Sequence, residues 1–437
     1  MKYPTVSVIV LSFNSLRYME PCFTSLGLLD YPEDRLELVL ADNASGDGSV
    51  EYVQEHFPEV RIIRFSQNHG FCGGNNRAAS QSQSEFVAFL NPDMRVDPYW
   101  LKGLVEKIGS ESDVVCASSK ILDWEGSRID FGGTLLQFLG HGRADGYQDP
   151  DLGAYDQVHY ILAPCGGAML IDRRLFLKVG GFDEDFAAYF EDVDLGWRLW
   201  ILGHKVVLAP KSICYHVHFG SFSKQPEAKL QYLYERNALY TIIKNYEQRY
   251  LDRVLPLALL LQARRAYLFG QISGIDPEVP RFSLGAAPVA STAVPAGYDA
   301  RYYLRETWHT LRNEGLSALR SRILEELGRR RRRPAGPETV SPGLASQQQS
   351  LFWIQQAYLA ATNDVVENYA ALMERRARIQ GERRRADQEI FETVRALSFD
   401  VCLNRPEYRQ TFQAMLELFG IQELFGEVFD PEIPFAS

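Results

Sequence analysis

The sequence predicts an α/β fold with a mostly parallel sheet in its first half, followed by a largely helical C-terminal region. Three observations favour this fold class. Short apolar strands alternate with helices up to about residue 90, polar residues follow four of these strands, and apolar stripes at helical spacing dominate after about residue 226. Right-handed crossovers make successive strands of such units parallel, and ligands lie beyond their carboxyl ends.

Composition narrows the class of protein. The chain has 437 residues, enough for two or three domains, and its net charge of -10 argues against a general nucleic-acid binder. Its six cysteines show no metal-binding spacing, which favours free thiols in a reducing compartment. No apolar run approaches the roughly 20 residues of a membrane span. We therefore expect a cytoplasmic protein, at most peripheral at the inner face of a membrane.

The elements of the first half follow from apolar runs and turn residues. We expect strands over 6–13, 36–41, 61–65, 86–90 and 114–121, and helices over 15–28, 49–57, 74–82 and 99–108. The polar residues that follow the first four strands are, in order, Ser12 and Asn14, Asp42 and Asn43, Asn68 and Gly70, and Asn91 and Asp93. Four consecutive polar endings at one edge of a parallel sheet predict a pocket there.

Loops and short strands are expected next. Residues 123–156 are rich in Gly and Asp and predict loops that shape specificity. A turn and a strand follow over 163–172, and two further strands over 205–208 and 214–218, the second carrying His216 and His218.

An acidic stretch, GGFDEDFAAYFEDVDLGWRLWILGH, separates the strand over 163–172 from those two strands. Leu195, Leu199 and Leu202 recur at helical spacing, so Glu191 and Asp192 fall in the first turn of a helix. Carboxylates are common there because the helix dipole favours them. Closely spaced carboxylates nevertheless repel one another, a cost usually tolerated where a cation or a proton transfer needs them.

These motifs resemble, in the same order, those of family 2 glycosyltransferases, inverting enzymes that use nucleotide-sugar donors. GGFDEDF with YFEDVDLGWR is similar to the acceptor-side signature of the branch that contains bacterial rhamnosyltransferases and galactofuranosyltransferases. VSVIVLSFN, LVLADNASGDGS, NHGFCGGNN and APCGGAMLID resemble the segments around the donor, and FLNPDMRVDP resembles the metal motif. The resemblance covers roughly residues 4–225 and implies a GT-A-type, Rossmann-like nucleotide-sugar domain.

The resemblance also implies roles for individual residues. Asp192 would be the catalytic base, Glu191 would orient the acceptor or Asp192, and Asp42 would bind a pyrimidine. Asp93 and His216 would bind Mg²⁺ or Mn²⁺, while Asn91 stands where the family often has a first aspartate. The residues expected at the nucleotide sugar are Ser12, Asn14, Asp42, Asn68, Gly70, Asn75, Asn91, Asp93 and Gly167. The implied activity is transfer of a sugar from dTDP-rhamnose or a UDP-sugar to a glycan or lipid-linked acceptor in cell-surface polysaccharide synthesis.

The C-terminal half carries no catalytic motif. We divide the chain into a transferase domain (1–225), a helical extension (226–333) and a helical C-terminal region (334–437). Apolar stripes on these helices are typical of a core or of an oligomer interface. The arginine run 329–333 is either a solvated segment or a contact for an anionic membrane or lipid-linked acceptor.

Two other functions are compatible with parts of the sequence. A sugar-nucleotide-binding scaffold without turnover would explain Asn91 in the metal motif, although Glu191, Asp192 and His216 favour an enzyme. A sugar nucleotidyltransferase would need a glycine-rich, basic loop after the first strand, and SFNSLRYME has neither feature.

Overall fold

The computed structural model describes residues 3–108, 110–157, 160–217, 226–273, 342–394, 396–397 and 406–426. Two expectations fall outside these residues: the arginine run 329–333 and His218. The boundary between the second and third predicted regions also lies outside them.

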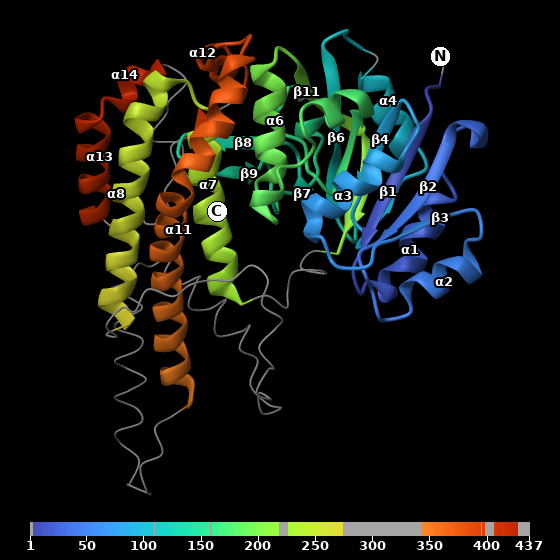
Figure 1. Ribbon diagram of the computed structural model, residues 1–437, viewed down its shortest axis with the longest axis horizontal. Helices are drawn as coiled ribbons and strands as arrows, with labels where there is room; N and C mark the ends of the chain where they lie inside the picture. The colour runs from blue at the N-terminus through green and yellow to red at the C-terminus, as the bar shows by residue number, and fades with distance from the viewer. Residues whose placement is uncertain are drawn as a thin grey trace, which may run out of the picture.

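A nine-stranded sheet organises the first half of the chain (Figure 1). Its order is β3 (Arg61–Arg64), β2 (Leu36–Asp42), β1 (Val6–Ser12), β4 (Phe86–Leu90), β10 (Ala168–Asp172), β6 (Val114–Asp123), β11 (Lys205–His216) and β5 (Met94–Val96), with β7 (Ile129–Phe131) beside β6. The strands β1 to β4, β6 and β11 run in one direction, and β5, β7 and β10 run against them. The predicted mostly parallel sheet is therefore confirmed.

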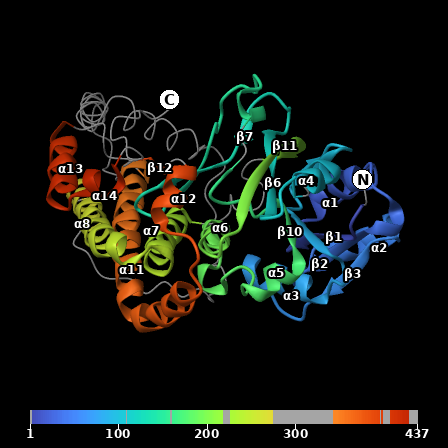
Figure 2. The same ribbon diagram turned by 90° about the horizontal axis from the view of Figure 1, so that it is seen from above.

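Helices cover both faces of this sheet, which is why its central strands are mostly buried. α1 (Leu16–Leu26) and α4 (Trp100–Ile108) lie on one face, and α3 (Gly70–Gln81) and α5 (Arg173–Lys178) lie on the other (Figure 2). α2 (Ser49–His56) packs against α1. Short 3-10 helices occur at Glu33–Arg35, Ala154–Gln157 and Glu184–Phe186. The five cysteines among the described residues are free thiols, as expected.

Three local expectations are corrected. α3 begins at Gly70 rather than at residue 74, because the side chain of Asn43 holds the turn before it. The two strands expected over 205–218 are one strand, β11, whose register shifts between Ala209 and Ile213. The segment 123–156 contains β7, β8 (Thr134–Gln137) and β9 (Gly142–Ala144), and β8 also pairs with β12 (Ala396–Leu397) from the far end of the chain.

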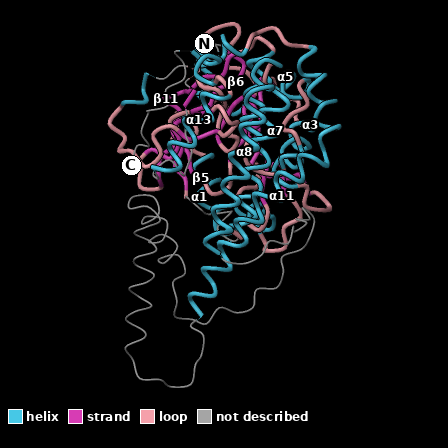
Figure 3. The backbone as a smooth tube through the Cα atoms, turned by 90° about the vertical axis from the view of Figure 1, so that its left-hand side faces the viewer, coloured by secondary structure: helices cyan, strands magenta, loops and turns pink. Residues whose placement is uncertain are grey.

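The second half of the described chain is helical, as expected. α6 (Glu191–Ile201) lies between the sheet and a group of C-terminal helices (Figure 1). Figure 3 views the molecule from the side of these C-terminal helices. These are α7 (Glu227–Asn245), α8 (Gln248–Ser273), α11 (Pro342–Gly381), α12 (Asp387–Thr393), α13 (Pro406–Leu418) and α14 (Ile421–Phe425). Among the described residues, no helix combines the length and apolarity that a bilayer crossing requires.

An aromatic cluster joins these helices to the sheet domain. The ring of Phe391 on α12 lies 5.6 Å from Trp197 on α6, 5.1 Å from Tyr250 on α8 and 4.8 Å from Phe425 on α14. All four rings are buried. Because aromatic side chains bury large areas and pack edge to face, this cluster holds α6 against three C-terminal helices.

Replacing Phe391 with Ala should lower the free energy of unfolding by about 3–5 kcal/mol, because it removes the central ring of the cluster and leaves a cavity. Urea denaturation followed by tryptophan fluorescence measures the change. Leu418→Ala is the matched control, since Leu418 is 78% exposed, and should shift stability by less than about 0.5 kcal/mol. Equal stability of Phe391→Ala and the native protein would contradict the packing described here.

Candidate active site

The loops after β1, β2 and β3 are joined by side-chain hydrogen bonds. The Asn14 side-chain oxygen Oδ1 accepts from the Gly46 backbone amide at 2.9 Å, and the Asn14 backbone amide donates to the Ser45 hydroxyl at 3.0 Å. Asn43 donates to the Asn68 side chain at 2.9 Å and to the Gly70 carbonyl at 3.0 Å. The structure thus brings the polar ends of these strands together at one edge of the sheet.

Ser12, Asp42 and Asn75 also lie at this edge and are buried. Ser12 pairs with Asp42 in the register of β1 and β2. The Asp42 carboxylate accepts from the Ser45 amide at 3.1 Å, and the Asn75 side chain donates to the Phe71 carbonyl at 3.1 Å. The Ser12 hydroxyl has no hydrogen-bond partner among the described residues. A buried hydroxyl of this kind is usually satisfied by water or a ligand.

Sheet register places Asn91 directly against Gly167. Ala168 pairs with Leu90, so the next residues, Gly167 and Asn91, face each other, and the Asn91 amide donates to the Gly167 carbonyl at 2.8 Å. A Cβ atom on Gly167 would lie only 2.5 Å from the Asn91 side chain. A glycine is therefore required there if Asn91 is to keep its position.

Sheet register also brings Asp93 and His216 together. His216 pairs with Met94 in the antiparallel β11–β5 ladder, so it lies beside Asp93 although the two are far apart in the sequence. His216 Nε2 is 3.7 Å from Asp93 Oδ1, and His216 Nδ1 is 2.7 Å from Asp130 Oδ2. Asp130, on β7, is a site residue that the sequence did not indicate.

The electrostatics of His216 are set by burial and by two neighbouring carboxylates. Burial acts to lower the pKa of His216, but its hydrogen bonds to Asp130 and Asp93 and their charges raise that pKa to about 9. Histidine metal ligands commonly use one ring nitrogen for the metal and the other for a carboxylate that orients the ring. Among the described residues, however, no group of three or more His, Cys, Asp or Glu side chains is arranged to hold a metal ion, so cation binding by Asp93 and His216 stays a prediction.

Glu191 and Asp192 begin α6 as predicted. The two Asp192 carboxylate oxygens accept from the Gly166 amide at 3.0 Å and from the Val193 amide at 2.8 Å. Burial raises the pKa of Asp192 against these hydrogen bonds, which lower it. Burial, and then the charge of Asp192, raise the pKa of Glu191 well above its ordinary value. A carboxylate whose ionised form is disfavoured is a stronger base, so Asp192 is suited to accept a proton.

Gly166 and Gly167 connect the two halves of the site. Gly166 binds Asp192, whereas its neighbour Gly167 binds Asn91, two residues before Asp93. Consecutive backbone groups of one turn therefore set the separation between the proposed base and the proposed cation site. The other candidate residues lie on neighbouring elements. Those at or just after the ends of β1 to β3 are Ser12, Asn14, Asp42 and Asn68, and those in α3 are Gly70 and Asn75.

The loop before α6 has an unusual backbone. Ala187, Tyr189 and Phe190 have φ angles of 61°, 67° and 64°, in the left-handed region that non-glycine residues rarely adopt. Asn237 on α7 donates to the carbonyls of Ala188 at 2.8 Å and Tyr189 at 2.7 Å. Arg236, also on α7, donates to the carbonyls of Asp185 and Phe186 at 2.8 and 3.0 Å. The helical extension thus holds the loop that orients Glu191 and Asp192.

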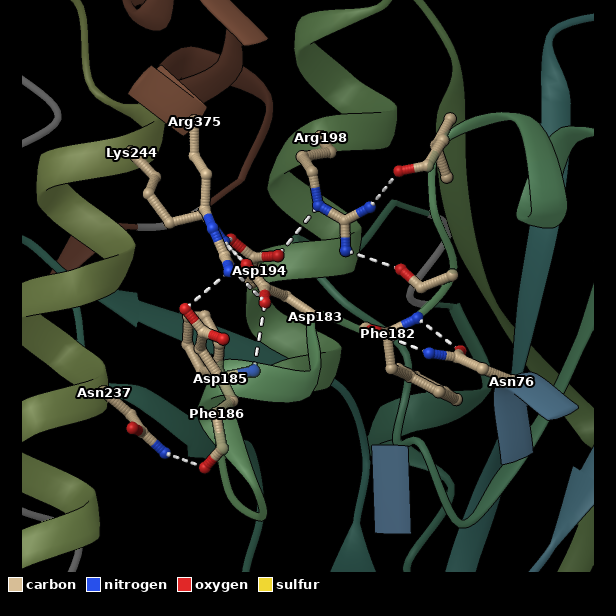
Figure 4. A network of polar contacts seen from close by, with 12 residues as sticks. Asn76, Phe182, Asp183, Asp185, Phe186, Asp194, Arg198, Asn237, Lys244 and Arg375 are labelled. Atoms are coloured by element: carbon tan, nitrogen blue, oxygen red, sulfur yellow. Dashed lines mark hydrogen bonds and ion pairs between the residues drawn. The ribbon is translucent and has the colours of Figure 1, made fainter. Parts of the chain in front are cut away.

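The remaining acidic residues of the signature have a structural role. Lys244 on α7 lies 2.6 Å from a carboxylate oxygen of Asp194 and 2.6 Å from one of Asp183. Arg198 contacts Asp194 at 2.8 Å, and Arg375 on α11 contacts Asp183. Lys244 and Arg375 approach from one side of these carboxylates and Arg198 from the other (Figure 4). The expectation that the acidic cluster serves a cation or proton transfer is thus corrected for Asp183 and Asp194, whose charges are balanced by the protein itself.

Sequence reasoning missed the contribution of α7, although a signal was present. The polar pairs Arg236–Asn237 and Lys244–Asn245 stand eight residues apart, which places them on one face of the helix, and all four are buried. Buried polar residues at helical spacing indicate specific partners.

Comparison with known proteins agrees with these observations. The family model described as "Glycosyl transferase family 2" matches residues 7–157. N-acetylgalactosaminyltransferase 6 of Drosophila melanogaster is 28% identical over 52% of this chain and 36% of its own. The O-antigen biosynthesis protein RfbC of Myxococcus xanthus is 28% identical over 45% and 16%. The chain thus spans only about a third and a sixth of these two relatives.

One further relative matches over most of its length. An N-acetylglucosaminyl-diphospho-decaprenol L-rhamnosyltransferase of Mycobacterium tuberculosis is 26% identical over 51% of this chain and 79% of its own. Among solved structures, a GalNAc-T7 structure with UDP, GalNAc and Mn²⁺ aligns at a TM-score of 0.47 and 16% identity over 61% of this chain and 51% of that one. At this level of similarity the alignment does not place individual residues.

Replacing Lys244 with Met should lower the free energy of unfolding by about 3–5 kcal/mol at pH 7, because two buried carboxylates lose their shared cation. Burial acts to raise the pKa of Asp183 and Asp194, but the charges of Lys244 and neighbouring arginines outweigh it and lower the pKa of both carboxylates. Carboxylates with lowered pKa stabilise the fold above their unfolded pKa, and this contribution is lost as pH falls. The difference between variant and native protein should therefore shrink below about pH 4.

Urea denaturation at pH 7, 4 and 3 measures this effect. Lys102→Met is the control, because the Lys102–Asp30 pair at 2.8 Å lies at the surface, where water screens it. A loss of stability in Lys244→Met that is the same at all three pH values would show that the charges are not its cause.

Proposed function

Because residues 7–157 belong to glycosyl transferase family 2, we propose that this chain is an inverting glycosyltransferase. It moves a sugar from a nucleoside-diphosphate sugar to a hydroxyl of a glycan or lipid-linked acceptor in cell-surface polysaccharide synthesis. The observation that carries the proposal is the turn at Gly166 and Gly167, which links the Glu191–Asp192 pair to the Asn91–Asp93 segment.

Asp192 acts as the base in this proposal. Its burial and raised pKa favour accepting a proton from the acceptor hydroxyl as that oxygen attacks the anomeric carbon. The Gly166 amide keeps the carboxylate in place during the attack. Glu191 is buried, and its Oε2 has no hydrogen-bond partner among the described residues, so it is available to orient the acceptor hydroxyl.

Asp93 and His216 hold a divalent cation in this proposal, with Asp130 fixing the imidazole ring. When bound, Mg²⁺ or Mn²⁺ supplies positive charge that offsets the charge developing on the departing diphosphate. Asn91, which donates its backbone amide to Gly167, would be a neutral partner of Asp93 in this site.

The donor is a pyrimidine nucleotide sugar in this proposal. Asp42 supports this choice because a carboxylate acceptor suits the N3–H of uracil or thymine. Rhamnose is our first choice of sugar, supported by the NPD sequence of the metal motif and by the mycobacterial relative named as a rhamnosyltransferase. The O-antigen relative supports a cell-surface glycan as acceptor. Membrane contact through residues 329–333 and self-association through the C-terminal helices remain predictions.

A panel of nucleotide sugars tests the proposal. With Mg²⁺ or Mn²⁺, dTDP-rhamnose or a UDP-sugar should raise the melting temperature and be hydrolysed slowly to the nucleoside diphosphate. Asp192→Asn should keep the thermal stabilisation but lose turnover by roughly two orders of magnitude, because its shape is preserved and its basicity is removed. If a nucleotide sugar raises the melting temperature of the native protein but no nucleoside diphosphate is released, the protein is a scaffold. Exclusive use of a GDP-sugar would refute the role of Asp42.

The cation should be needed for turnover and for binding of the diphosphate. Excess chelator should abolish donor hydrolysis, and Asp93→Ala should weaken binding of the nucleotide sugar more than binding of the free nucleoside. Asp130→Asn should reduce Mn²⁺ affinity by about 10–100-fold, as expected for a residue that orients a ligand. Release of the nucleoside diphosphate measures hydrolysis, and calorimetric titration measures the binding of the nucleotide sugar and of Mn²⁺. Asp252→Ala, on the exposed side of α8, is the control. Full hydrolysis in chelator would contradict this assignment.

A further inference from the structure

A partly exposed aromatic surface lies beside the Glu191–Asp192 pair. The rings of Tyr189 and Tyr234 are 4.6 Å apart, with an angle of 31° between their planes, and Phe190 contacts Tyr234 edge to face at 5.4 Å. Tyr234 is 36% exposed. We call Tyr189 and Tyr234 the tyrosine platform. It combines residues from the loop before α6 and from α7.

The platform is held rigidly at the start of α6. Tyr189 and Phe190 immediately precede Glu191, and the carbonyl of Tyr189 accepts from Asn237, which lies three residues after Tyr234 on α7. Tyr189 also packs against the buried cluster that includes Ala228 of α7 and Ala357 of α11. The same helix therefore presents one ring of the platform and anchors the other.

The platform lies near the proposed base, because Tyr189 and Phe190 immediately precede Glu191 and Asp192 and both rings contact Tyr234. Burial, and then the charges of Asp192 and Glu191, raise the pKa of Tyr234 to about 12. Tyr147, from the segment between β9 and β10, adds a smaller contribution to the same shift. Tyr147 is 37% exposed, and its own pKa is raised by burial and by the charge of Asp130.

We propose that the tyrosine platform is the binding subsite for a neutral sugar ring of the acceptor, which stacks on Tyr234 with a hydroxyl directed at Asp192. The inference rests on the proposed function and deepens it by specifying the acceptor chemistry. The hydroxyl that Asp192 deprotonates must lie within hydrogen-bond reach of it, so the rest of the acceptor must occupy the adjacent surface.

The chemistry of this surface favours a sugar over a phosphate or a bare alkyl chain. A sugar ring has an apolar C–H face that suits an aromatic ring and hydroxyls that suit the Glu191 oxygen, which has no partner among the described residues. An anionic group placed here would be repelled by the charge of Asp192. An alkyl chain would leave the buried carboxyl of Glu191 without a partner.

Binding of simple glycosides tests the inference without any donor. Saturation-transfer NMR with the methyl pyranosides of glucose, galactose, N-acetylglucosamine and rhamnose should show contact of at least one ring with the native protein. Tyr234→Ala should weaken that binding by about two- to tenfold, the range expected for loss of an aromatic stacking contact. Tyr234→Phe, which keeps the ring, should stay within about twofold of the native protein. Tyr267→Ala is the control, because Tyr267 is an exposed tyrosine on α8.

Each outcome decides the inference. It is wrong if none of the four glycosides binds the native protein, or if Tyr234→Ala binds them as well as Tyr267→Ala does. It is also wrong if octyl phosphate, tested in the same way, depends on Tyr234 and the glycosides do not. Circular dichroism verifies that the variants are folded. Because the proposed function is tested by release of the nucleoside diphosphate, its failure would be seen separately from failure of the platform.

Discussion

The buried ammonium group of Lys244 joins the two halves of this protein. It lies between Asp194 in the first turn of α6 and Asp183 in the loop before that helix, and it comes from α7 in the C-terminal half. Neither carboxylate could be buried without a cation, since desolvation of an unpaired charge is very unfavourable. The position of α6, and of Glu191 and Asp192 at its start, therefore depends on docking of the helical extension.

Sheet register supplies the other side of the site. β10 runs antiparallel to β4 and so places Gly167 opposite Asn91, while the short antiparallel strand β5 places Asp93 beside His216. The parallel strands bring polar loops to one edge, and the strands that run against them add the groups expected to face the diphosphate. A mixed sheet is therefore what assembles these residues.

The C-terminal half belongs to the site more closely than its lack of catalytic motifs indicates. The sequence places every proposed catalytic residue before residue 226. Yet Arg236 and Asn237 hold the left-handed loop at Ala187 to Phe190. Tyr234 borders the same carboxylates. The helical extension thus contacts the loop that leads into Glu191 and Asp192.

Local patterns were sufficient to predict the strands β1 to β4, the polar loops at their ends and the acidic start of α6, because apolar periodicity and turn residues are properties of short segments. They could not assign partners across long separations. Asp130 meets His216 from 86 residues away, and Arg375 meets Asp183 from 192 residues away. In the sequence, Asp183 and Asp192 belong to one acidic run. Only the tertiary structure distinguished their surroundings. The cations that neutralise Asp183 come from α7 and α11, whereas the hydrogen bonds of the Asp192 carboxylate among the described residues come from backbone amides, and burial raises its pKa.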